Sequence, residues 1–143
     1  MVTNEVLFKE CYMMLMRVLI VGVVLMFLAA CGSVGGTAGD PTRGKQLFDG
    51  AVAMASDRAP PCATCHSTRP GIDTGSGQSL AGIGNRAGAT VPGQSAEEYL
   101  RTSITNPDAF LSGNYQEGIM YRDYAQALTT QQINDLVAYM LTI

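Results

Sequence analysis

The sequence predicts a small all-α domain, and two observations support this. Helix-capping residues open three segments, at Asp40-Pro41, at Ser95-Ala96-Glu97-Glu98 and at Thr129-Thr130-Gln131-Gln132. No stretch shows the alternation of apolar and polar residues that is typical of a half-buried strand. The 143 residues are enough for one such domain and for a segment that precedes it.

The first expected helix begins at Asp40, which is a good N-cap, with Pro41 at the first helical position. One face of this helix carries four small or apolar residues, Gly44, Leu47, Phe48 and Ala51, and Met54 is expected near its end. A glycine on that face permits the close approach of another helix. The pair Pro60-Pro61 stops any helix that would continue further.

The segment from Ser67 to Arg86 is rich in glycine and has no helical or strand period, so it predicts an Ω-like loop. The capping box at Ser95 opens a short helix that ends at Asn106-Pro107. Its inward residues are expected to be Tyr99, Leu100 and Ile104. Another loop is expected from there to Tyr124.

The capping box at Thr129 opens the last helix. Its apolar residues recur at the spacing of an amphipathic helix and should face the core: Ile133, Leu136, Val137, Met140 and Leu141.

The pentapeptide Cys62-Ala63-Thr64-Cys65-His66 is the attachment signature of a c-type haem. Two residues between the cysteines let one turn present both sulfurs to the two vinyl groups, and the histidine then lies under the iron. A zinc site, a redox dithiol and a structural disulfide are the alternatives. A zinc site would need further ligands, but His66 is the only histidine and the other two cysteines lie far upstream. A thioredoxin-like dithiol would need a βαβ pattern, which is not found.

A haem iron needs a sixth ligand, and the single histidine excludes bis-histidine ligation. The thioether of a methionine is the natural candidate. Met54 lies upstream of the haem motif, which places it close to the proximal side. Met140 lies on the apolar stripe of the last helix, where a role in the core is expected. Met120 lies in a loop between two helices, and it is the predicted distal ligand.

The N-terminal segment predicts export. Arg17 is followed by an apolar run that ends in Leu28-Ala29-Ala30-Cys31, the pattern of a lipoprotein signal. Residues 1–30 are therefore expected to be a signal peptide, 31–39 a lipidated Cys31 with a flexible tether, and 40–143 the domain. The domain would then be anchored by lipid on the periplasmic side or the outer face of the cytoplasmic membrane. The alternative is an uncleaved helix over 12–30, which is near the lower length limit for spanning a membrane.

The charge of the chain bears on its partners. The formal net charge is −3, which argues against nucleic acid because nucleic acid binds basic surfaces. An acidic domain favours partners that present basic docking patches.

Over residues 40–143 the pattern resembles the class I c-type cytochromes. Gly44 and Phe48 match the Gly-x-x-x-aromatic pattern of that family's first helix, and Tyr139 matches the aromatic residue of its last helix. The resemblance implies a fold in which the N- and C-terminal helices cross and loops wrap one covalently bound haem c.

The resemblance also implies further haem contacts. Gln78 stands where the family has a proline whose carbonyl accepts a hydrogen bond from the proximal histidine, and Leu80 of the same stretch is expected to contact the haem. Arg86 matches an arginine that pairs with a haem propionate, and a solvated loop arginine is the alternative. Tyr121 replaces the proline that often follows the distal methionine, and Tyr99 and Tyr121 could also reach the propionates.

The implied function is single-electron transfer in a respiratory or photosynthetic chain, and not enzymatic catalysis. A lipid anchor with one haem is similar to the monohaem subunit of alternative complex III, and the C-terminal half is similar to the cytochrome domains of haem–copper oxidases. The expected partners are therefore redox proteins, such as a quinol-oxidising complex or a terminal oxidase. The alternative is a haem enzyme or a gas or redox sensor with a labile sixth ligand, which requires that Met120 does not bind the iron.

Overall fold

The structure, a computed structural model, describes residues 13, 14, 16 and 38–143. The chain divides into two units, 1–36 and 37–143. The predicted signal peptide and Cys31 thus lie outside the described residues, apart from three methionines of the first unit. Among the described residues, no helix is both long enough and apolar enough to cross a membrane.

Residues 38–143 form a helical domain. Its α-helices are α2 (Pro41–Asp49), α3 (Ile83–Arg86), α4 (Ala96–Thr105), α5 (Tyr124–Ala127) and α6 (Thr130–Met140). Three single 3₁₀ turns separate them, η1 (Cys62–Thr64), η2 (Ala87–Ala89) and η3 (Pro107–Ala109). No strand occurs in this domain as described, and the predicted all-α class is confirmed.

Helix α2 begins where the sequence predicts. The Asp40 carboxylate accepts hydrogen bonds from the amides of Thr42 and Arg43, and Pro41 occupies the first helical position. The helix ends earlier than expected because Gly50 adopts a left-handed conformation with φ of 76°, which glycine reaches without steric cost. Ala51 is therefore exposed beyond the helix instead of lying on its buried face.

Helices α4 and α6 both begin at complete capping boxes. The Ser95 hydroxyl accepts from the Glu98 amide while the Glu98 carboxylate accepts from the Ser95 amide, and Thr129 and Gln132 repeat the arrangement. The predicted inward residues of α4 are buried, as are four of the five predicted for α6. The exception is Leu141, which is 41% exposed because α6 ends at Met140 and Leu141 is its C-cap.

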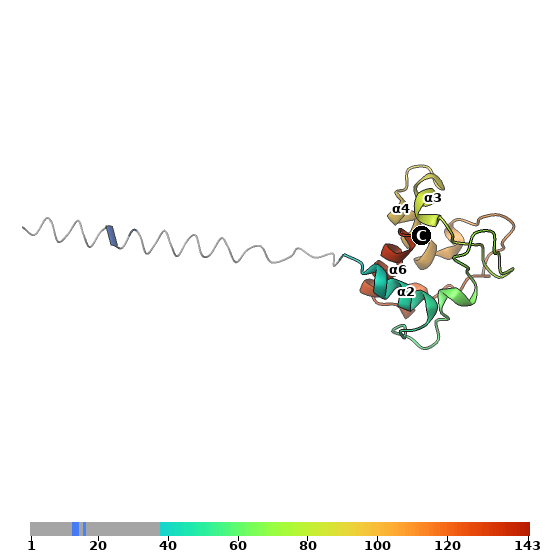
Figure 1. Ribbon diagram of the computed structural model, residues 1–143, viewed down its shortest axis with the longest axis horizontal. Helices are drawn as coiled ribbons and strands as arrows, with labels where there is room; N and C mark the ends of the chain where they lie inside the picture. The colour runs from blue at the N-terminus through green and yellow to red at the C-terminus, as the bar shows by residue number, and fades with distance from the viewer. Residues whose placement is uncertain (1–12, 15, 17–37) are drawn as a thin grey trace, which may run out of the picture. The chain divides into compact units, whose positions relative to one another are not determined.

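Helices α2 and α6 cross in close contact (Figure 1). Gly44 lies so near α6 that a Cβ atom there would be 1.9 Å from the Asp135 carbonyl oxygen and 2.8 Å from the Tyr139 Cβ. One turn later, the rings of Phe48 and Tyr139 meet edge to face, with centroids 5.4 Å apart. The glycine-against-aromatic crossing implied by the resemblance is therefore present.

A buried carboxylate joins the same two helices. Asp135 on α6 is fully buried, and it accepts hydrogen bonds from the Asp40 main-chain amide at 2.8 Å, the Arg43 Nε at 2.6 Å and the Gln131 side-chain Nε2 at 2.8 Å. Burial alone would raise the pKa of Asp135, but these hydrogen bonds outweigh it, so the pKa lies below its usual value. Asp135 was not among the residues expected from the sequence to be buried.

Other parts of the chain differ from expectation at the level of single turns. The last four residues of the predicted loop 67–86 form α3. The predicted loop that runs to Tyr124 is followed directly by α5, which begins at that residue. Helix α3 is held by the chain terminus, because the Gly84 amide donates to the Ile143 carbonyl at 2.7 Å. Gly39, the last residue of the expected tether, packs against Asn134 of α6.

Candidate haem-binding site

A cavity of about 430 Å³ lies inside the domain and has the size of a typical cofactor site. Its walls come from α2, η1, α3, α4, η3, α5, α6 and the long loops. Much of the lining is apolar: Phe48, Pro60, Pro61, Leu80, Ile83, Leu100, Ile104, Leu136 and Met140. Cys62, Cys65, His66 and Met120 line this same cavity, so the predicted attachment and ligand residues meet at one apolar site.

The haem motif forms a single tight turn. Pro61 is extended, and the 3₁₀ turn η1 follows it directly. The carbonyl oxygen of Cys62 accepts from the amides of both Cys65, at 3.1 Å, and His66, at 2.9 Å. This turn presents both cysteine side chains to the cavity, as the two-residue spacing predicts.

Cys62 and Cys65 do not form a disulfide with each other. Burial raises the pKa of the Cys62 thiol to about 12, so this thiol stays protonated at neutral pH. The described part of the chain also contains no group of three His, Cys, Asp or Glu residues arranged to hold a metal ion.

His66 is oriented by the loop that follows it. Its Nδ1 lies 3.0 Å from the Gln78 carbonyl oxygen, the acceptor that the resemblance implies. Because a carbonyl can only accept, Nδ1 carries the proton and Nε2 keeps its lone pair for a metal. The role of His66 as a haem ligand stays a prediction, but its ring is set in the tautomer that this role requires.

Gly77 permits this arrangement by lying directly against the imidazole. A Cβ atom at this position would lie 2.8 Å from the His66 Cε1 and 2.5 Å from the Cys65 carbonyl oxygen. Real Cβ atoms do not approach so closely, so only glycine fits without displacing the ring or the backbone of the motif.

Further hydrogen bonds fasten the loop on the His66 side. The Leu80 amide donates to the Ser67 carbonyl at 2.8 Å, which closes the loop at its base. The Ser79 hydroxyl donates to the Arg69 carbonyl at 2.8 Å, and the Thr74 hydroxyl donates to the Cys65 carbonyl. These contacts hold the loop whose Gln78 carbonyl accepts from His66. They do so although this loop lacks the proline of the related family.

Arg86 is placed differently from the other predicted site residues. Its guanidinium donates to the Ser79 carbonyl at 2.8 Å and to the Ala81 carbonyl. It is exposed and is not among the residues that line the cavity. In this structure Arg86 therefore fastens the loop, and its pairing with a propionate stays a prediction. Leu80, Gln78, Tyr99 and Tyr121 do line the cavity.

Met120 lies on the cavity wall, half-buried, between the exposed Ile119 and the half-buried Tyr121. Its loop is braced by Asp108 of η3, which was not identified from the sequence. The Asp108 carboxylate accepts from the Gly118 amide at 2.9 Å and from the Arg122 guanidinium. These two contacts flank Met120 by two residues on either side, so they hold the loop in place although Tyr121 replaces the usual proline.

Of the other methionines in the domain, Met140 also reaches the cavity, from the buried face of α6. Met54 is half-buried against the core and does not line the cavity. The sequence gives no signal for Asp108, because its partners lie 10 and 14 positions further along a loop without regular periodicity.

One comparison with known proteins gives a match. The family model for "Cytochrome c" matches residues 41–143, from the first residue of α2 to the end of the chain. No match was found among curated proteins or among solved structures.

Proposed function

The chain belongs to the cytochrome c family, and from this premise we propose that it is a single-electron carrier with its haem iron held between His66 and Met120. Membership of this family of electron-transfer haem proteins implies one covalently bound haem c. Under the proposal, Cys62 and Cys65 form the two thioether bonds. The observation that carries it is the meeting of these four residues at one apolar cavity.

When bound in this cavity, the haem would supply an iron that can alternate between the ferrous and the ferric state. The chain contributes the two axial ligands, an apolar enclosure and a fixed geometry. The Gln78 carbonyl accepts the hydrogen bond from His66 Nδ1, so the lone pair of the neutral imidazole lies on Nε2, where it can bind the iron. If His66 and Met120 hold the iron, electron transfer would require little rearrangement of these two side chains.

Met120 is the preferred distal ligand over Met140 on structural grounds. Met140 is 7% exposed in the core, on the last turn of α6, where moving its sulfur would disturb helix packing. Met120 lies on a loop segment whose two ends are fixed by Asp108. Such a segment can present a thioether without disturbing a helix.

The test compares two methionine variants of the haem-loaded protein. Ferric haem with a methionine ligand shows a charge-transfer absorption band at the red end of the visible spectrum. We expect Met120→Ala to lose this band, whereas the matched variant Met140→Leu keeps it. Loss of the band in Met140→Leu alone would reassign the ligand, and loss in neither variant would refute methionine ligation by these residues.

We also propose that the carrier is tethered by lipid at Cys31 and works with a redox complex, either a quinol-oxidising complex or a terminal oxidase. The support is the lipoprotein-type signal before Cys31 and the glycine-rich segment after it. Mass spectrometry of the purified protein tests the tether, since it reports the N-terminus, the lipid and the haem together. An unlipidated chain that begins at Met1 would contradict this part of the proposal and would leave the haem site unaffected.

A further inference from the structure

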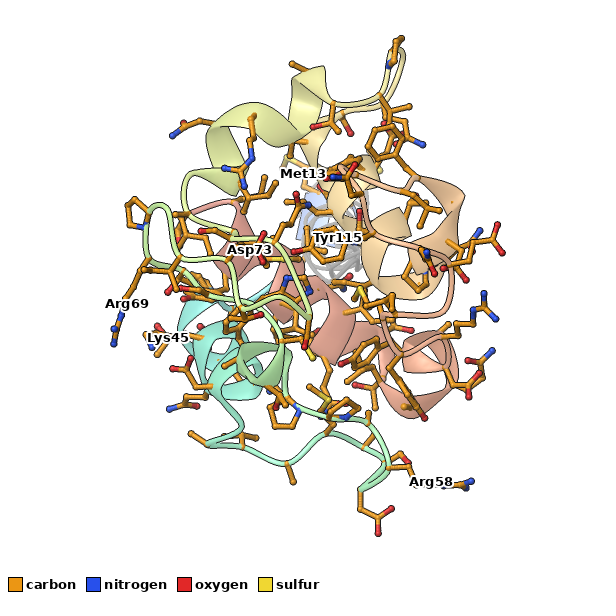
Figure 2. All side chains as sticks on the ribbon, turned by 90° about the vertical axis from the view of Figure 1, so that its right-hand side faces the viewer. Met13, Lys45, Arg58, Arg69, Asp73 and Tyr115 are labelled. Carbon is orange, nitrogen blue, oxygen red and sulfur yellow. The ribbon has the colours of Figure 1, made fainter. Side chains whose placement is uncertain are left out.

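The loops on the two sides of the cavity are joined directly by side chains. The Ser112 hydroxyl, in the segment that leads to Met120, donates to the Gln78 Oε1 at 2.7 Å. The Tyr115 hydroxyl, three residues later, donates to the Asp73 carboxylate at 2.6 Å. Figure 2 shows Asp73 and Tyr115 next to each other, whereas Lys45, Arg58 and Arg69 project outward from the domain.

These two contacts lie at the edge of the proposed haem site. Gln78, Ser112 and Tyr115 all line the cavity, and all three are half-buried. The partners are separated by 34 and 42 positions in sequence, so each contact restrains one loop relative to the other. Neither bond lies within a helix or between helices.

Gln78 takes part in both halves of the site. Its main-chain carbonyl accepts a hydrogen bond from the Nδ1 of His66 at 3.0 Å, and its side-chain Oε1 accepts one from the Ser112 hydroxyl at 2.7 Å. A proline at this position could supply the carbonyl but not the side-chain bond. Gln78 therefore adds a hydrogen bond to Ser112 that the proline found at this position in the family cannot form.

We propose that Gln78 is a positioning residue that couples the two axial ligands, with Asp73–Tyr115 as a second bond in parallel. Its carbonyl orients His66, and its bond to Ser112 keeps the loop of Met120 closed over the haem. This inference rests on the proposed ligation by Met120. It predicts that the bridge resists displacement of the methionine by an external ligand.

The experiment measures imidazole binding to the ferric, haem-loaded protein, followed by loss of the methionine charge-transfer band. The variants are Gln78→Leu, Ser112→Ala and the double variant. A hydrogen bond of this kind corresponds to about a two- to tenfold change in an equilibrium constant. We expect each single variant to bind imidazole tighter by this factor, and the double variant to bind no tighter than the stronger single variant, because both changes break the same bond.

The matched control is Gln46→Leu, the same substitution at an exposed position of α2, which should leave imidazole binding unchanged. Tyr115→Phe should produce its own tightening, additive with Ser112→Ala, because the second bond is separate. Unchanged affinity in both Gln78→Leu and Ser112→Ala, or effects that simply add in the double variant, would overturn the proposal.

Hydrogen exchange separates a failure of this proposal from a failure of Met120 ligation. If the wild-type ferric protein has no charge-transfer band, Met120 is not the ligand and the coupling of two axial ligands fails with it. The loop bridge itself is then judged by amide exchange in residues 110–120 of the haem-loaded protein. Faster exchange there in Gln78→Leu, and not in Gln46→Leu, would show that the bridge exists; equal exchange would show that it does not.

Discussion

The smallest feature on which the haem site depends is the absence of a side chain at Gly77. The glycine backbone lies against the His66 ring and the Cys65 carbonyl, and this contact sets the ring in the position where Gln78 can bind its Nδ1. A chain with a less rigid residue in place of the family's proline thus still fixes its histidine, through steric contact as well as hydrogen bonding.

Gly77→Ala should therefore disturb the site. The new Cβ would lie 2.5 Å from the Cys65 oxygen and 2.8 Å from the His66 Cε1, and relieving such overlaps in a packed region costs about 1–3 kcal/mol. We expect a corresponding fall in the free energy of unfolding and a shifted reduction potential, measured by denaturant titration and voltammetry. Gly88→Ala is the control, since its Cβ would meet nothing closer than 3.4 Å. Equal results for the two variants would refute the steric account.

Asp108 is the corresponding residue on the Met120 side. Asp108→Ala removes the acceptor for both the Gly118 amide and the Arg122 guanidinium, so its free energy of unfolding should lie below that of the wild type. It should also weaken the methionine band. Asp108→Asn keeps an acceptor for the amide and should lose less.

Asp49→Asn provides the comparison for Asp108, because it breaks an exposed pair with Lys45 on α2, and such pairs contribute little. Denaturant titration and the ferric spectrum are recorded for all three variants. If Asp108→Ala behaves like Asp49→Asn in both measurements, the contacts of Asp108 with Gly118 and Arg122 do not hold the loop of Met120.

At the scale of elements, the crossing of α2 and α6 organises the domain, and Asp135 is its polar centre. The carboxylate joins the N-terminus of α2 to the middle of α6, through the Asp40 amide and the Arg43 guanidinium. Since its hydrogen bonds lower the pKa of Asp135, its contribution to stability is present above the pKa of the unfolded chain, about 3.9. That contribution is lost as the pH falls through the lower folded pKa.

Asp135→Asn should reproduce this loss at neutral pH. The variant cannot carry the charge that pairs with Arg43, so its free energy of unfolding at pH 7 should lie below that of the wild type. The difference should shrink as the pH is lowered from about 4 through the folded pKa of Asp135, because the unfolded chain binds a proton at this carboxylate first and the folded wild type then loses the same charge. Denaturant titrations at each pH measure this. Other carboxylates titrate equally in both proteins, so a difference that stays constant with pH would contradict the assignment.

The elements differ in how far they could be predicted. Capping signals at Asp40, Ser95 and Thr129 are local in sequence, so the starts of α2, α4 and α6 were predicted correctly. The single-turn helices α3 and α5 were not, because four residues are too few to show a period. The end of α2 was placed too late, since the left-handed turn at Gly50 was not anticipated.

The same distinction holds for the site. The haem motif and the methionine candidate can be read from residue types and spacing alone. The long-range contacts of Asp135, Asp108 and Gln78 join residues from 10 to 95 positions apart, and they exist only once the helices have packed. A polar residue gives no local sign that it will be buried with a distant partner, which is why these positions had to come from the structure.

At the scale of the whole molecule, helices and loops of the domain surround an apolar cavity. Hydrogen bonds join these loops to each other across the chain. The proposed electron carrier requires that the side chains of His66 and Met120 fill both axial positions of the haem iron, which leaves no open position on the iron.

Carbon monoxide binding to the reduced, haem-loaded wild-type protein tests this claim most directly, followed by absorption spectroscopy at neutral pH. With His66 and Met120 both on the iron, the ferrous spectrum should stay unchanged when carbon monoxide is added. Rapid and stoichiometric formation of a carbon monoxide complex would show an open or labile sixth position, and would identify the protein as a haem enzyme or a gas sensor instead of an electron carrier.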